Sequence, residues 1–418
     1  MESSRLALRT KALWQEKLPY LAPGVFLFIL PFPGTVALRL TALSVATITA
    51  AVVWKRTAPP PIPLKLPIAL WLLVAAASLI WAVDPGYSLL EIKNEIGYTT
   101  MAYLSFYVLS RGERQWRNWN WIFMTGFVAI AAISAYYLAR GMDDVLVGKG
   151  ALLGRHGGPG SASTYLILVS PLLLLALERS IAKTRTSPAP WILLVIMISA
   201  AYMSGNRIFW IALTLSVTVY TGLRLFRRMN WVRAFKLTAL VFLLTFIAAG
   251  ALLFAAAGFR FSTGASLDAF LEILAQDPRM ELWRFAIAQI GAHPLFGTGF
   301  GLGSARSMLA QRFDDPLLWH AHNIFLNYGL QMGIPGMLTL VLLFASIGRE
   351  FIILYRSPDD TCSALGTAGL TMLAGILAKS MTDNLLGRNN SLLFWALTGM
   401  ILGYGRRILA RDASQPRE

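Results

Sequence analysis

Between Gly258 and Gly336 the chain reads Asp277-Pro-Arg279-Met-Glu-Leu-Trp283-Arg284, then Gly297-Thr-Gly299-Phe-Gly301-Leu-Gly303, then His320-Ala-His322-Asn323 and Gly333-Ile-Pro335-Gly336. This is the longest polar interval between apolar segments, and its end carries two of the four histidines of the chain. On both sides the sequence consists mostly of apolar runs. We therefore expect a polar unit that is held between membrane-spanning segments.

The composition is typical of a membrane protein. Of the 418 residues, 56% are hydrophobic and 14% are charged, and apolar runs of about 17 to 25 residues are typical of transmembrane helices. Because a backbone in lipid must satisfy its hydrogen bonds internally, we expect an all-α polytopic fold. The pattern predicts 12 spans: 18–34, 36–54, 66–83, 89–109, 119–139, 162–178, 189–204, 207–223, 237–257, 323–347, 363–383 and 390–406.

The basic residues predict the orientation of these spans. The formal net charge is +16, which in a soluble protein would suggest nucleic acid. Here the lysines and arginines crowd alternate short loops, as the positive-inside rule expects, so we expect no nucleic-acid partner. With twelve spans, both termini are cytoplasmic. The predicted domains are residues 1–257 with nine spans, a large helical periplasmic loop at 258–321, and residues 322–418 with three spans and a cytoplasmic tail.

A helix is predicted to begin inside the periplasmic loop, with Asp277 as its N-cap and Pro278 at its first position. Its expected apolar stripe is Trp283, Ala286, Ile287 and Ile290. Arg279 lies one turn before Trp283 on this stripe, whereas Arg284 is about 140° away around the helix. Arg279 is therefore the better candidate for a buried anion contact.

The pair His320 and His322 has three possible roles. With Asp314 and Asp315 it could bind a metal, but no H-E-x-x-H spacing is present and no aspartate pair resembles a sugar-nucleotide metal site, so we expect none. The histidines could also merely cap the tenth span. The third role is catalytic, because a neutral imidazole can accept a hydroxyl proton.

Arginines on the predicted outer side favour the catalytic role. Arg207, in Ser204-Gly-Asn-Arg207, lies at the mouth of a span, and Arg279 lies in the loop. Guanidinium groups bind phosphate in a bidentate manner and stay charged. A base beside a phosphate clamp at the outer leaflet suits transfer from a polyprenyl-diphosphate donor.

Two weaker features belong to the same face. The run Gly297–Gly303 lacks the strand–turn–helix context of a dinucleotide site, and it predicts a turn before a short helix at 304–311. Its glycines would let the backbone approach a ligand closely. Lys93, near the outer end of the fourth span, is either a structural residue or a phosphate contact.

The motifs of this region resemble those of the O-antigen ligases. His322-Asn323, nine residues, Gly333, two residues and Gly336 is similar to the signature of that family. Arg279 with Trp283, and Pro294-Leu-Phe-Gly297-x-Gly299-x-Gly301, resemble the core that O-antigen ligases share with O-antigen polymerases. Ser204-Gly-Asn-Arg207 resembles the other arginine motif of the family, with Ile211 where leucine is usual.

The resemblance implies a GT-C-like, metal-independent inverting glycosyltransferase of the bacterial inner membrane. It would move O-antigen polysaccharide from undecaprenyl diphosphate to lipid A-core on the periplasmic side, without a cofactor. His322 would be the catalytic base, and Arg207 and Arg279 would bind the diphosphate. Secondary candidates are His320, Asn323, Lys93 and Arg284. The alternatives are an O-antigen polymerase, a protein O-oligosaccharyltransferase and, outside the enzymes, a twelve-span transporter.

Overall fold

The computed structural model describes residues 20–32, 34–139, 159–182, 187–204, 206–261, 277–315, 318–382 and 388–414. Within these ranges the regular structure is helical throughout, which confirms the all-α prediction. The principal helices are the one over Tyr20–Ile29, α2 (Val36–Thr57), α3 (Lys65–Ala77), α4 (Pro85–Glu91), α5 (Tyr98–Leu109), α6 (Glu113–Ala139), α7 (Pro159–Ile181), α8 (Ala189–Ser204), α9 (Arg207–Arg228), α10 (Trp231–Phe261), α12 (Arg279–Ala292), α13 (Arg306–Arg312), α14 (Ile324–Tyr355), α15 (Asp360–Ser380) and α16 (Arg388–Ser414).

Six of these helices are long and apolar enough to cross a membrane, namely α2, α7, α9, α10, α14 and α15. The chain is therefore a multi-pass helical membrane protein. Helices also lie in each of the other predicted spans, as in the shorter apolar helices over Tyr20–Ile29 and Ala189–Ser204. The total of twelve crossings, and the periplasmic side of the polar loop, stay predictions.

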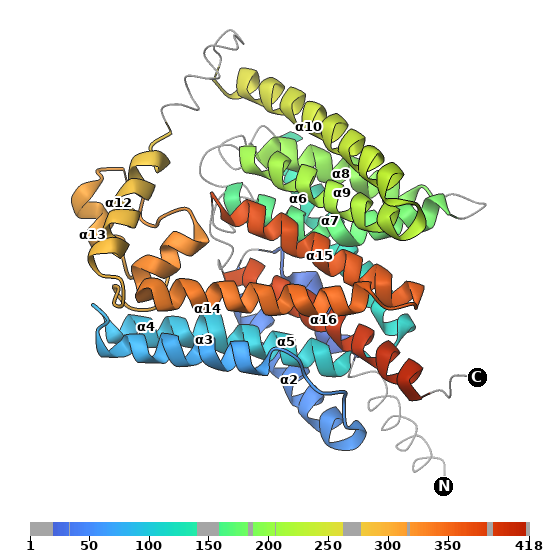
Figure 1. Ribbon diagram of the computed structural model, residues 1–418, viewed down its shortest axis with the longest axis horizontal. Coiled ribbons are helices and arrows are strands. Elements are labelled where there is room, and N and C mark those ends of the chain that lie inside the picture. Colours follow the sequence, from blue (N-terminus) through green and yellow to red (C-terminus); the bar gives the residue numbers. More distant parts are fainter. Residues whose placement is uncertain are drawn as a thin grey trace.

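The closest helix packing in the bundle joins α5 and α16. A Cβ on Gly399 or Gly403 would overlap the backbone carbonyls of Tyr103 and Tyr107 on α5. Two glycines spaced by four let helix backbones approach closely, which drives helix association in lipid. The ring of Trp395 on α16 also stacks on that of Trp71 on α3, with centroids 6.0 Å apart. In contrast, α10 lies along the edge of the bundle (Figure 1), and its side chains are mostly exposed.

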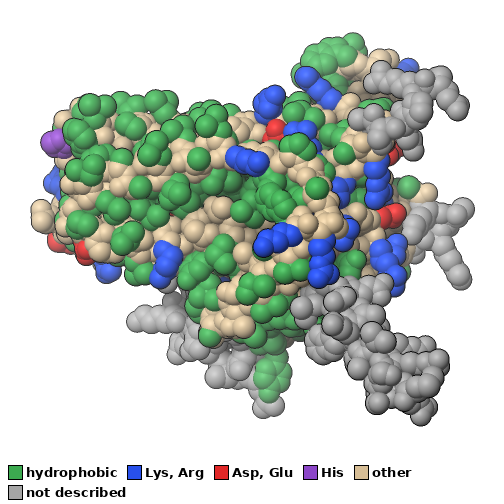
Figure 2. Space-filling model, turned by 90° about the horizontal axis from the view of Figure 1, so that it is seen from below, with side chains coloured by type: hydrophobic (Ala, Val, Ile, Leu, Met, Phe, Trp, Pro, Cys, Tyr) green, Lys and Arg blue, Asp and Glu red, His purple; other side chains and the backbone are tan. Residues whose placement is uncertain are grey.

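Lysine and arginine side chains gather toward the end of the molecule where α16 ends (Figure 2). Some of these charges are built into the fold. The guanidinium of Arg407 donates to the carbonyls of Tyr107, Val108 and Ser110, at distances of 2.8 to 3.0 Å, and so caps the end of α5. The distribution agrees with the positive-inside rule.

The polar loop folds over the opposite end of the bundle, where α12 and α13 lie beside the start of α14 (Figure 1). The helix begins one residue later than predicted, since its N-cap is Pro278 and not Asp277. The Asp277 carboxylate still accepts from the Arg279 N–H, at 3.0 Å. The predicted stripe was partly wrong. Leu282, Ala286 and Ile290 are buried, whereas Ile287 is 60% exposed. The segment 262–276 lies outside the described residues.

The glycine run lies against protein backbone. The Thr298 and Gly299 N–H groups donate to the carbonyls of Leu330 and Gln331 on α14, at 2.9 and 3.0 Å. Downstream, the Gly303 N–H donates to the Tyr87 hydroxyl on α4 at 2.9 Å. The sequence predicts that these glycines let the backbone approach a ligand, whereas the close approach in the structure is to α4 and α14. The predicted turn and short helix are present, with α13 starting at Arg306.

The same loop breaks α14 at the place where the sequence indicates an interruption. Gly333 has φ 66° and ψ −160° inside the helix, two residues before Pro335. The freed N–H of Ile334 donates to the carbonyl of Pro294 at 2.7 Å. The break is therefore stabilised by the segment that follows α12.

We expect Gly301→Ala to destabilise the fold strongly. Gly301 has φ 120°, and an added Cβ would lie 2.9 Å from atoms of Glu91 and Tyr87. Backbone strain alone costs about 1–3 kcal/mol, so the thermal midpoint of the purified protein should fall by several degrees. The matched control is Gly291→Ala on α12, where a Cβ meets open space. A Gly301→Ala protein that melts with the parent would contradict the tight packing.

Candidate active site

The segment His320–Asn323 forms a tight turn before α14. His320 is 6% exposed, and His322 has a left-handed backbone with φ 48°. The two imidazole rings lie 3.8 Å apart, and the Nδ1 atom of His320 accepts from the His322 N–H at 3.0 Å. Because Nδ1 is an acceptor, His320 is the neutral tautomer with its proton on Nε2. His322 therefore has a neutral neighbour when it takes up a proton.

Three side chains hold this turn in place. Asn323 caps α14, because its Oδ1 accepts from the N–H groups of Phe325 and Leu326 at 3.0 and 3.1 Å. The Asn327 Oδ1 accepts from the Ala321 N–H at 2.7 Å, and the Trp283 indole donates to the Ala321 carbonyl at 2.8 Å. The backbone beside His322 is thus fixed from both α14 and α12.

Arg279 begins the helix that makes this contact. It precedes Trp283 by one turn, and the buried face of α12 packs with Ala321 and Leu330 in one apolar cluster. The Arg279 side chain is 37% exposed, and its Nε lies 3.9 Å from the Asp277 carboxylate. The guanidinium is therefore partly open and not buried as the stripe had predicted.

Arg207 comes to the same end of the bundle through the packing of α9 against α15. The Arg227 guanidinium lies 3.8 Å from the Asp360 carboxylate, and Ser216 packs against Gly375. The helices therefore run antiparallel, and extending this register brings Arg207 level with the end of α15, at residues 380–382. Within that range, the carbonyl of Met381 accepts from the Asn323 Nδ2 at 3.1 Å. Arg207 is also the first residue of α9, and the positive end of a helix dipole favours anions.

The other two basic candidates are less closely tied to this turn. Arg284 is exposed on α12, away from the buried stripe, as helical geometry predicts. Lys93 is exposed on a π-helical turn, Ile92–Gly97, and it lies between the buried carboxylates Glu91 and Glu95. This pair of buried acids, spaced by four in an apolar segment, is a signal that could have been read from the sequence.

Arg39 is a buried arginine that the sequence motifs did not identify as a candidate. It is 5% exposed near the start of α2, and its Nη1 donates to the Oδ1 of Asn389. An arginine inside an apolar span is itself a signal of function or of a buried pair.

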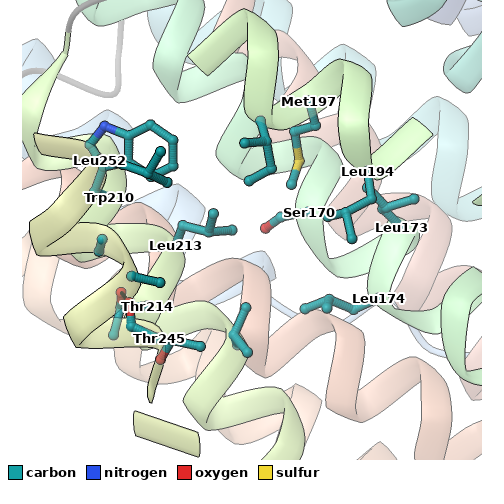
Figure 3. A pocket seen from close by; sticks show the side chains of 14 residues that line it. Ser170, Leu173, Leu174, Leu194, Met197, Trp210, Leu213, Thr214, Thr245 and Leu252 are labelled. Carbon is teal, nitrogen blue, oxygen red and sulfur yellow. Dashed lines mark hydrogen bonds between the residues drawn. The ribbon is translucent and has the colours of Figure 1, made fainter. Parts of the chain in front are cut away.

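An apolar cavity of about 200 Å³ lies between α7, α8, α9 and α10 (Figure 3). Trp210, one turn beyond Arg207, points into it, as do Leu173, Leu194 and Met197. The three hydroxyl groups in its wall are satisfied locally, because Ser170, Thr214 and Thr245 all donate to backbone carbonyls. The space is thus suited to hydrocarbon.

We expect Asn323→Ala to weaken both the fold and the site. It removes the N-cap of α14, which typically costs about 1 kcal/mol, and the bond that ties this turn to α15. Asn323→Asp keeps the cap and replaces the donor to Met381 by a carboxylate oxygen that faces the same carbonyl. The thermal midpoint should therefore fall more for Asn323→Ala than for Asn323→Asp. Equal melting of the two variants would show that the cap contributes little.

Fold and site together define a multi-pass helical membrane protein that gathers histidine and arginine side chains at one end of its bundle. Residues 192–341 match the family model described as O-Antigen ligase, and this match over about a third of the chain supports a place in the O-antigen ligase family. The resemblance stated from the motifs is thereby confirmed. The match runs from α8 into α14 and includes Arg207, Arg279 and His322. No protein of curated function matches the chain.

Proposed function

We propose that the chain is an O-antigen ligase of the bacterial inner membrane. It transfers O-antigen polysaccharide from undecaprenyl diphosphate to a sugar hydroxyl of lipid A-core on the periplasmic side. The family match supports a ligase or polymerase of O-antigen in general. The donor, the acceptor and the residue roles are our inference.

In the proposed reaction His322 accepts the proton of the acceptor hydroxyl. The hydroxyl oxygen attacks the anomeric carbon as the bond from that carbon to the diphosphate oxygen breaks, which inverts the anomeric centre. Arg207 and Arg279 hold the diphosphate and stabilise the charge that it gains. The leaving group is already good, so the mechanism needs no metal or cofactor.

The proposal rests on one observation above all, the fixed turn at His322. The left-handed backbone, the neutral His320 ring at 3.8 Å and the Asn323 cap hold one imidazole at a helix mouth. A merely structural histidine would not need support from α12, α14 and α15 together. With its backbone held from these three helices, the turn is preorganised as catalysis requires.

A reconstituted assay tests the function directly. The purified protein in proteoliposomes receives lipid-linked polysaccharide with lipid A-core, with lipid-linked repeat units, or with an acceptor protein. Ligation to lipid A-core alone supports the proposal. Extension of the lipid-linked chain would identify a polymerase, and glycosylated serine or threonine would identify a protein O-oligosaccharyltransferase. Counterflow of a labelled solute without transfer would identify a transporter.

The apolar cavity supplies a place for the isoprenoid chain of the donor. It lies in the membrane-spanning part of α7–α10, and Trp210 in its wall follows Arg207 by one helical turn. A diphosphate at Arg207 would therefore carry its hydrocarbon chain toward this space. Burial of such a chain is favourable in proportion to its apolar area.

We expect Ala249→Phe, which adds bulk to this cavity, to raise KM for the undecaprenyl donor by about 5- to 20-fold. Ala249 is 7% exposed and lines the cavity from α10. A donor with a short isoprenoid should react as before, because it does not reach so far. The control is Leu244→Phe, at a position on α10 that is 57% exposed. An equal loss with both donors would place the chain elsewhere.

A further inference from the structure

A second cavity, of about 1190 Å³, lies at the other end of the bundle from His322. It is formed by the helix over Tyr20–Ile29, the turn after α5 and the first turns of α6. The turn after α5 is also where Arg407 of α16 caps the Ser110 carbonyl. This is the end where lysines and arginines gather, so the cavity is separate from the candidate active site.

The lining of this cavity changes from charged to apolar. Arg111, Glu113 and Arg114 line one side, and all three are exposed. The other side is apolar and includes Leu21 and Phe28, which are 58% and 37% exposed. These two side chains lie on one helix, about 10 Å apart along its axis. The cavity thus joins a polar rim to a wall that faces the lipid.

An unsatisfied donor lies in the polar part of the wall. Gln115 is 3% exposed, and its Oε1 accepts from the Arg111 N–H at 2.9 Å. Its Nε2 is buried and meets no acceptor among the described residues. The bond from the Arg111 N–H to Gln115 fixes the backbone of this arginine at the polar side of the cavity.

We propose that this cavity binds an anionic phospholipid of the adjacent leaflet. The phosphate of the headgroup lies between Arg111 and Arg114, while an acyl chain lies along Leu21 and Phe28. Basic pockets between membrane helices bind such headgroups. Glu113 leaves the lining with a net positive charge. The residues before Tyr20 are poorly matched in charge to this positive lining, because they carry four basic and two acidic side chains.

The test is lipid binding to the full-length protein. Protein stripped of lipid in a neutral detergent is titrated with phosphatidylglycerol or phosphatidylcholine, and the bound lipid is counted by native mass spectrometry. Arg111→Gln with Arg114→Gln should weaken phosphatidylglycerol binding by about 10- to 30-fold, at roughly 1 kcal/mol for each charge, and leave phosphatidylcholine unchanged. Both arginines are exposed, so the fold should survive their replacement.

The control is Arg117→Gln, an exposed arginine of the same helix that is not part of the lining. It should leave phosphatidylglycerol binding within about twofold of the parent. A parent protein that binds both lipids equally would overturn the proposal. So would an Arg117→Gln loss equal to that of the double variant, which would indicate a diffuse charge effect. Competition by inorganic phosphate as strong as that by the lipid would indicate a soluble anion instead.

Discussion

His322→Ala is expected to lower the rate of polysaccharide transfer to lipid A-core by about 10²- to 10⁴-fold, the usual contribution of a general base. The acceptor hydroxyl would then have no imidazole to take its proton, while the donor would still bind. The effect should therefore appear in kcat and hardly in KM. Steady-state assays with purified donor and acceptor measure both quantities.

The matched control is His293→Ala. His293 is exposed just after the end of α12 and has no part in the proposed chemistry. Its rate should equal that of the parent. His320→Ala should give an intermediate loss, because His320 acts by holding the His322 backbone. Full activity of a folded His322→Ala protein would remove this residue from the mechanism.

Arg207→Ala is expected to cost about 10²- to 10³-fold in kcat/KM, as for the loss of one donor to a developing negative charge. Arg207→Lys should recover only part of this, because an ammonium group keeps the charge and loses the bidentate geometry. Binding of undecaprenyl diphosphate, measured by its competition with the donor, should weaken in parallel.

Arg284→Ala is the control for this series, since Arg284 is exposed on α12 away from the buried stripe. It should retain nearly the parent rate. Arg279→Ala should resemble Arg207→Ala if both side chains bind one diphosphate, and the double variant should then lose less than the product of the single losses. Strictly multiplicative losses would indicate that the two arginines act on separate groups.

The fold could be predicted to the extent that it depends on the lengths of the apolar runs in the sequence. Helix positions follow from the need to satisfy the backbone in lipid, and the interruption of α14 follows from Gly333 and Pro335. Packing partners could not be predicted in this way. The approach of Gly399 and Gly403 to α5, and the exposed position of α10, depend on shape complementarity between distant segments.

The site was predictable in its residue types but not in its supports. His322 and Arg207 could be chosen because charged or titratable groups beside apolar spans are costly. The cap by Asn323 follows from a general preference at helix starts. Trp283 and Asn327 both bond to the backbone of Ala321. These contacts depend on the path of the turn, which cannot be predicted from the neighbouring residues. Periodicity placed Ile287 in the buried stripe wrongly because α12 packs on one narrow face, through Leu282, Ala286 and Ile290.

The bond from the Pro294 carbonyl to Ile334 has a consequence for chimeric proteins. A carbonyl that lies beyond α12 completes the hydrogen bonding of a helix that starts thirty residues later in the sequence. A chimeric protein with a junction between Pro294 and Ile334 would take one of these residues from this chain and the other from a relative. The hydrogen bond between them would then join segments that do not belong together. Specificity should therefore be exchanged between relatives as one cassette that runs from Arg279 through Gly336.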